Sequence, residues 1–186
     1  MDGWKFKNGN SKMKSQEFTL PNIGPKLAGT LQLYVPRPKK VKEVLKPTSG
    51  FMYSVIWTST AEKTKTGIYT SAWVEWCKTE MPQWLSDTGK MYKVKPGARI
   101  LSMNTDKDAY KIAEHYGIKP PKDMIESFIW AQKFPWDDIE NDFDAVHHVP
   151  GGSRLHNMLM SSWDVESTAW FNTNFLDYVK DVRINV

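Results

Sequence analysis

The sequence contains a single cysteine, Cys77, among 186 residues. A chain with one cysteine forms no internal disulfide, which excludes the small secreted proteins that disulfides hold together and favours an intracellular protein. Long apolar runs are also absent, since no stretch approaches the roughly 18 residues that a membrane-spanning helix needs. The N-terminus lacks the apolar core of a signal peptide. We therefore expect a soluble, cytoplasmic protein.

Several catalytic and binding motifs are missing as well. The glycines at 150–154 (PGGSR) follow neither the P-loop pattern nor the G-x-G-x-x-G pattern of dinucleotide-binding folds. His147, His148 and His156 lie within ten residues, but adjacent residues on a strand point to opposite faces, so His147 and His148 do not easily share one metal ion. We expect no metal site here. Cys77 is expected to be a buried structural thiol rather than a nucleophile.

Aromatic residues, in contrast, are abundant: nine Trp, seven Tyr and eight Phe. Such side chains fill cores, and they also line sites that stack planar ligands. Lysine is concentrated in residues 1–48, whereas residues 137–146 (DDIENDFDAV) are acidic. A basic surface favours nucleic acid or an acidic protein as the partner. Because no arginine-rich run or nucleic-acid motif is present, we expect a protein partner rather than a nucleic acid.

The order of patterns predicts one α+β domain with a mostly antiparallel sheet at residues 30–186, preceded by an irregular basic N-terminal arm at 1–29. Alternating or β-branched runs predict strands at 30–35, 51–60, 143–149, 161–171 and 176–186, and on both sides of Pro96-Gly97. Helical spacing predicts helices at 41–45, 71–81, 106–117, 122–133 and 135–142. In the helix at 122–133, we expect Met124, Ile125, Phe128 and Ile129 to face the core. Ser71 and Asp106 are the expected N-caps.

Two carboxylates, Asp164 and Glu166, stand at the beginning of the strand predicted at 161–171. Residues two apart on a strand share one face, so both side chains are expected to project to the same side. Carboxylates that lie close together repel each other, which prepares one of them to hold a proton or to act as a base. The alternative is that both acids are exposed to solvent where the strand begins.

The order of three motifs resembles the Arg–Ser–Glu class of mono-ADP-ribosyltransferases. Arg37 closes the first strand, Thr58-Ser59-Thr60 ends the next, and Asp164-Val165-Glu166 follows a Gly-rich loop. The resemblance covers roughly residues 30–175 and implies an ADP-ribosyltransferase-like fold with a split, mostly antiparallel sheet and flanking helices. It extends to small phage-encoded enzymes that modify host or defence proteins, which would place the protein in the host cytoplasm.

The resemblance also implies the residues that would bind the substrate, NAD. Arg37 would hold its phosphates, and Thr58, Ser59 and Thr60 would shape the nicotinamide pocket. Tyr69 or Trp73 would stack on the nicotinamide ring.

Glu166 would be the catalytic carboxylate, and Asp164 would orient the incoming nucleophile. Breaking the bond between nicotinamide and ribose develops positive charge on the ribose, as in glycoside cleavage, and a carboxylate stabilises such a state. The resemblance thus implies a transferase that modifies a protein or a nucleic acid, or an NAD glycohydrolase if water is the acceptor. Two alternatives remain: a non-enzymatic interaction protein, such as a phage inhibitor with a basic, aromatic surface, and a hydrolase that uses Asp164 or Glu166 with His147.

Overall fold

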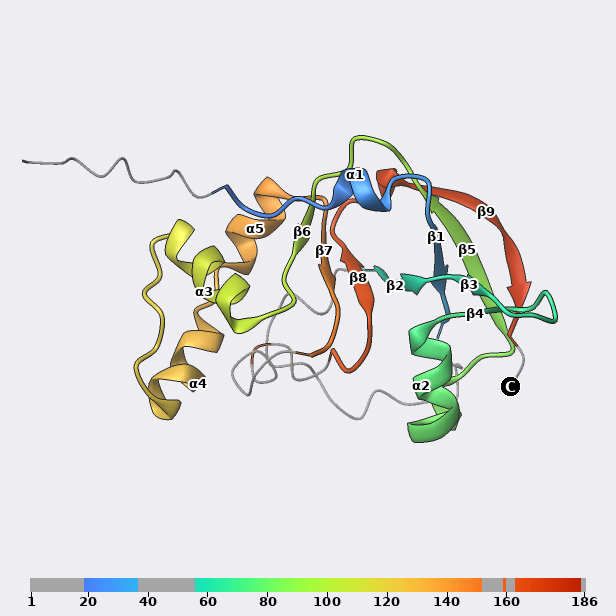
Figure 1. The fold of residues 1–186 in the computed structure, drawn as a ribbon, viewed down its shortest axis with the longest axis horizontal. Coiled ribbons are helices and arrows are strands. Elements are labelled where there is room, and N and C mark those ends of the chain that lie inside the picture. Colours follow the sequence, from blue (N-terminus) through green and yellow to red (C-terminus); the bar gives the residue numbers. More distant parts are fainter. Residues whose placement is uncertain (1–18, 37–55, 152–158, 160–162, 185–186) are drawn as a thin grey trace, which may run out of the picture.

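In the computed structural model, which describes residues 19–36, 56–151, 159 and 163–184, helices and strands follow each other irregularly along the chain (Figure 1). Arg37, the helix predicted at 41–45 and the first five residues of the strand predicted at 51–60 lie outside the described residues. Most of the Gly-rich loop at 150–162 lies outside them too.

In the described part of the chain, seven strands form the main sheet, in the order β6-β7-β8-β2-β1-β5-β9. Within the described residues, all neighbouring strands of this sheet are antiparallel except the parallel pair β6 and β7. The prediction of an α+β protein with a mostly antiparallel sheet is therefore confirmed. The strands are β1 (Leu31–Tyr34), β2 (Ile56–Thr60), β5 (Thr88–Val94), β6 (Ile100–Ser102), β7 (Ala145–His148), β8 (Ser167–Trp170) and β9 (Leu176–Arg183), and the short pair β3 (Glu62–Lys63) and β4 (Tyr69–Thr70) forms a separate ribbon.

Three helices connect the parallel strands: α3 (Asp106–His115), α4 (Met124–Gln132) and α5 (Trp136–Asp142). Parallel neighbours require a long crossover connection, and here that connection carries the helices. They gather at the β6 end of the sheet, opposite β9 (Figure 1). Apolar side chains of the helices pack there with the sheet in one buried cluster, which includes Leu101, Met103, Ala109, Ile112, Ala113, Trp130, Ile139, Val146 and Ala169.

Helix α2 (Ala72–Glu80) begins where the sequence predicted, because the Ser71 hydroxyl accepts a hydrogen bond from Val74 N at 3.4 Å. Cys77 is fully buried in a second cluster with Leu33 and Met91, as expected of a structural thiol. Helix α3 begins differently from the prediction. Thr105, not Asp106, is its N-cap, and Asp108 completes a capping box by accepting a bond from Thr105 N.

The predicted orientation of α4 is wrong. Met124, Ile125, Phe128 and Ile129, which were expected to face the core, are 56%, 75%, 60% and 50% exposed. Ser127 and Trp130 are the residues of this helix that are buried. The apolar stripe runs along the outer side because Trp130, with its larger ring, packs against Tyr110 and Phe134 and fixes the inner side.

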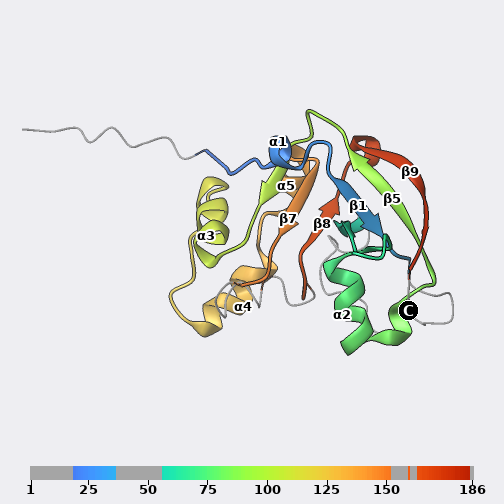
Figure 2. The ribbon, with the colours of Figure 1, turned by 45° about the vertical axis from the view of Figure 1, so that its right-hand side comes forward.

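Residues 19–29, the described part of the predicted arm, pack against the sheet. In α1 (Gly24–Leu27), a Cβ on Gly24 would lie 1.7 Å from the carbonyl oxygen of Ala98, so this close approach requires glycine. Asn22 Oδ1 accepts bonds from Gly24 N and Ile100 N, each at 2.9 Å. Residues 19–29 therefore pack on the domain (Figures 1 and 2).

Strand β2 joins two halves of the sheet. Its first three residues pair with β8, whereas Ser59 and Thr60 pair with β1. The strand predicted at 161–171 is shorter than expected, since β8 begins at Ser167. Asp164 and Glu166 therefore precede the strand, and the alternation argument that placed both on one face does not apply to them.

Candidate functional site

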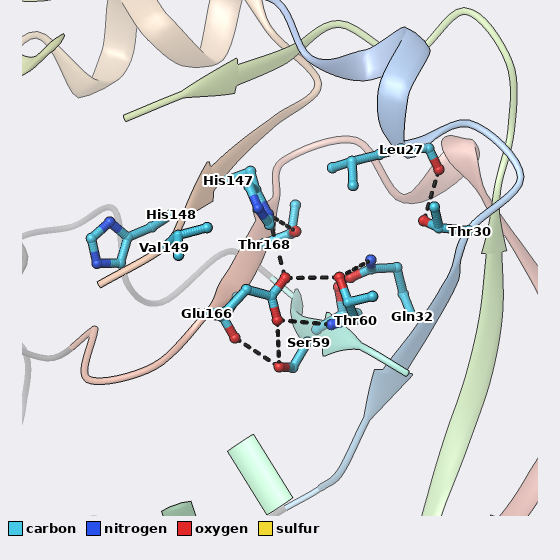
Figure 3. A network of polar contacts seen from close by, with 12 residues as sticks. Leu27, Thr30, Gln32, Ser59, Thr60, His147, His148, Val149, Glu166 and Thr168 are labelled. Atoms are coloured by element: carbon cyan, nitrogen blue, oxygen red, sulfur yellow. Dashed lines mark hydrogen bonds and ion pairs between the residues drawn. The ribbon is translucent and has the colours of Figure 1, made fainter. Parts of the chain in front are cut away.

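The side chain of Glu166 is held by the end of β2. Its Oε2 accepts bonds from Ser59 Oγ at 2.9 Å and from Thr60 N at 3.0 Å, and its Oε1 accepts one from Thr60 Oγ1 at 2.8 Å (Figure 3). Ser59 Oγ also lies 2.7 Å from the backbone oxygen of Glu166. The Glu166 side chain remains 19% exposed. It is therefore a fixed carboxylate that solvent, or a ligand, still reaches.

The sheet register explains this position. β2 and β8 pair from Ile56↔Trp170 to Thr58↔Thr168. Two more residues in the same antiparallel register bring Glu166 opposite Thr60. There the ladder has ended, and the Glu166 carboxylate accepts the bond from Thr60 N that a backbone carbonyl would otherwise accept. The end of β2 thus offers two hydroxyl groups and one backbone N–H as hydrogen-bond donors to the Glu166 carboxylate.

A chain of hydrogen bonds behind Glu166 runs in one direction. Trp170 Nε1 donates to Thr58 Oγ1 at 2.8 Å, and Thr58 Oγ1 donates to Gln32 Oε1 at 2.7 Å. Gln32 Nε2 donates to Thr60 Oγ1 at 3.1 Å, which in turn donates to Glu166. Every hydroxyl in this chain both accepts and donates, so the orientation of each group is determined and the Thr60 proton points to Glu166.

His147 lies on the other side of the same carboxylate. Its Nδ1 is 3.6 Å from Glu166 Oε1 and 2.9 Å from Thr168 Oγ1 (Figure 3). Register places His147 directly opposite Thr168, so the two strands β7 and β8 orient the ring. Burial lowers the pKa of His147, and the nearby Glu166 carboxylate partly offsets this by raising it. The imidazole is therefore neutral at pH 7.

The two histidines of β7 face opposite ways, as the sequence predicted. His148 is buried and its Nδ1 lies 2.9 Å from the backbone oxygen of Met103, away from Glu166. Among the described residues, no group of three or more His, Cys, Asp and Glu side chains is arranged to hold a metal ion.

The structure brings some of the predicted site residues together and leaves others apart. Ser59, Thr60 and Glu166 form the site. Thr58 contributes through Gln32 and does not contact Glu166. Asp164 is exposed and makes no hydrogen bond or ion pair with a described residue. Arg37 lies outside the described residues.

The two aromatic residues expected to stack on nicotinamide differ in their distance from the site. The Trp73 backbone N donates to Ser59 Oγ at 3.4 Å, but its ring stacks on Trp76 at 5.2 Å between centroids. Tyr69 is half-buried on β4, with Lys180 Nζ 4.9 Å from its ring centre. Trp73 therefore contacts the site through its backbone, and Tyr69 makes no hydrogen bond or ring contact with Ser59, Thr60 or Glu166.

Sequence reasoning missed Gln32 and did not connect His147 with the Ser59–Thr60 strand end. Gln32 is fully buried in the middle of an apolar strand, LQLY, and a lone amide in such a strand is a sign of a buried polar partner. The hydrolase alternative did pair His147 with Glu166, and the two side chains lie 3.6 Å apart. No local pattern indicated how they meet, because their contact depends on the pairing of β7 with β8.

The structure has a further hollow, which is not part of this site. This hollow beside β5 and β9 is lined by Pro36, Thr88, Gly89, Lys90 and Asp181, none of which contacts Glu166. In the described part of the chain, no helix has the length and apolar character required to cross a bilayer.

Comparisons with known proteins give no match: no family model, no curated protein and no solved structure is similar to this chain.

Proposed function

We propose that this chain is an NAD-dependent mono-ADP-ribosyltransferase, which transfers ADP-ribose to a macromolecular acceptor in the cytoplasm and releases nicotinamide. The observation that carries the proposal is the bonding of Glu166 to Ser59 and Thr60. These are two of the three motifs on which the resemblance to the Arg–Ser–Glu class rests, and they lie more than a hundred residues apart in the chain.

The sheet supports the same proposal at the level of the fold. Its halves, β6-β7-β8-β2 and β1-β5-β9, are joined by two residue pairs, Gln32↔Thr60 and Leu33↔Ser59. We propose that this short junction corresponds to the split sheet of an ADP-ribosyltransferase-like fold. Glu166 binds at the junction itself, because Ser59 and Thr60 belong to both the junction and the site.

The donor set around Glu166 suits a ribose hydroxyl of NAD. Oε2 already accepts two bonds, whereas Oε1 accepts one, from Thr60 Oγ1. A carboxylate oxygen has two acceptor positions, so Oε1 can accept one more hydroxyl proton. A carboxylate fixed there stabilises the positive charge that develops on the ribose as the bond to nicotinamide breaks, and removing one such group typically costs about 10²–10³ in rate.

The test uses NAD labelled in its adenine ring, incubated with the protein and a cell lysate. A transferase places the label on a macromolecule, and Glu166→Gln abolishes this. Label recovered solely as ADP-ribose, with or without lysate, identifies a glycohydrolase. A wild-type protein that neither binds NAD nor transfers label contradicts the proposal.

The exposed apolar face of α4 favours a second candidate, a non-enzymatic interaction protein. Four neighbouring apolar side chains at 50–75% exposure are unusual on a soluble protein's surface and are typical of a contact with another protein. The two candidates predict opposite results. If the chain is an interaction protein, the immobilised wild type retains cell proteins, Phe128→Gln loses this retention and Glu166→Gln keeps it. If the chain is a transferase, Glu166→Gln loses label transfer.

A further inference from the structure

His147 and Glu166 form a pair in which a neutral base lies beside a fixed carboxylate. The 3.6 Å between Nδ1 and Oε1 is too long for a hydrogen bond but close enough for the carboxylate to stabilise a positive charge on the ring. In the tautomer with a proton on Nδ1, this atom donates to Thr168 Oγ1 and faces Glu166, and Nε2 carries the lone pair. Nε2 makes no hydrogen bond with a described residue.

Among the described residues, one charged group acts on His147. Across the sheet it pairs with Ser102 of β6 and Thr168 of β8, neither of which titrates near neutral pH. Glu166 is the described titratable residue that faces it. A proton on the ring is therefore stabilised by the neighbouring carboxylate, and no described cation acts against it. This arrangement supports a histidine that acts as a base.

Asp164 does not have a comparable setting. It is exposed, and no described residue orients its side chain. Asp164, the first acid of the motif, thus has no contact with a described residue that would direct it at a nucleophile. His147, in contrast, is oriented by Thr168 and lies beside Glu166.

We infer that His147 is the base that takes the proton of the acceptor, and that the acceptor is a hydroxyl group or water rather than a guanidinium. The inference rests on the proposed function. In the step, the bond between ribose C1′ and nicotinamide N1 breaks and its electron pair leaves with neutral nicotinamide. The acceptor oxygen uses a lone pair to bond to C1′, its proton passes to Nε2 of His147, and His147 returns that proton to solvent.

The choice of acceptor follows from the strength of the base. A hydroxyl oxygen has a lone pair while it is still protonated, so a weak base suffices to take the proton as the new bond forms. A guanidinium keeps its proton far above neutral pH, and it has no available lone pair until it loses that proton. A neutral imidazole whose pKa is lowered is too weak a base to remove that proton beforehand.

Product analysis with the wild-type protein tests the acceptor class without any substitution. Purified protein and NAD are incubated with methanol as the hydroxyl acceptor or with agmatine as the guanidinium acceptor. We expect methyl ADP-ribose beside free ADP-ribose, and no agmatine adduct. An agmatine adduct as the main product overturns the inference and leaves the proposed function standing.

Variants then test the residue, with His115→Gln, an exposed histidine on α3, as the matched control. We expect His147→Gln to lower kcat for nicotinamide release by about 10²–10⁴ and to leave the Kd for NAD unchanged. It also removes the decline of the wild-type rate at acid pH. A His147→Gln variant that keeps the wild-type rate and pH profile overturns the inference, as does a loss of methyl ADP-ribose in Asp164→Asn but not in His147→Gln.

A titration of the histidine rings by NMR gives a readout that needs no turnover. The His147 signal, assigned by its loss in His147→Gln, should titrate below 6.5 and still lower in Glu166→Gln, because the carboxylate raises its pKa. An unchanged value in Glu166→Gln contradicts the pairing. Wild-type protein that releases no nicotinamide under any condition contradicts the proposed function and this inference together, which separates that failure from the failure of the inference alone.

Discussion

At the scale of single residues, the hydroxyl of Thr60 connects the buried amide of Gln32 with the carboxylate of Glu166. Thr60→Val removes this hydroxyl while keeping the shape, so Gln32 Nε2 loses its acceptor inside the sheet. A buried polar group without a partner costs about 1–3 kcal/mol. We therefore expect Thr60→Val to lower the free energy of unfolding in urea by about that amount.

Thr60→Ser is the matched control for this prediction. It keeps the hydroxyl and loses one methyl group, so we expect a cost of about 1 kcal/mol or less and near-normal nicotinamide release. Equal losses of stability in Thr60→Val and Thr60→Ser contradict the role of the hydroxyl in the chain from Trp170 to Glu166.

The pH dependence of stability is also set at this scale, by His147. Its pKa in the folded protein is lowered, whereas in the unfolded chain it is near 6.5. As the pH falls through about 6.5, the unfolded chain takes up a proton that folded His147 does not, so protons favour unfolding. We expect wild-type protein to lose more stability between pH 7 and pH 5 than His147→Gln does. Urea unfolding at both pH values measures the difference, and two equal losses contradict a buried, neutral His147.

At the scale of elements, the two sides of α4 differ strongly in how much of their side chains is exposed. Trp130 is 4% exposed and Phe128 is 60% exposed. We expect Trp130→Ala to cost about 3–5 kcal/mol of unfolding free energy and Phe128→Gln to change it by about 0.5 kcal/mol or less. Chemical denaturation of both variants measures this. A cost of several kcal/mol for Phe128→Gln would mean that the apolar face is covered in the folded protein.

The same helix shows what sequence patterns determine at this scale. Helical spacing predicted that α4 exists and roughly where it ends, because spacing depends on local geometry. It did not predict which side is buried, because Met124, Ile125, Phe128 and Ile129 form a wider stripe than the single Trp130. Which stripe faces inward depends on the contacts of Trp130 with Tyr110 and Phe134, both of which lie outside the helix.

At the scale of the whole molecule, the site depends on strand order. The resemblance implied a common site for Ser59, Thr60 and Glu166, but no local pattern specified the pairing of β2 with β8 that brings them together. Gln32 and His147 join the site for the same reason, through β1 and β7. Such long-range pairings are set by the packing of the whole sheet and not by local patterns.

In the proposed reaction, the carboxylate of Glu166, fixed by the end of β2, acts on the ribose of NAD. The most direct measurement is the rate of nicotinamide release from NAD by the purified protein and by Glu166→Gln, which keeps the size of the side chain and removes its charge. We predict measurable release by the wild type and a loss of at least about 10²-fold in the variant, with NAD still bound. Equal rates in the two proteins, or a wild-type protein that neither binds nor cleaves NAD, would contradict the claim.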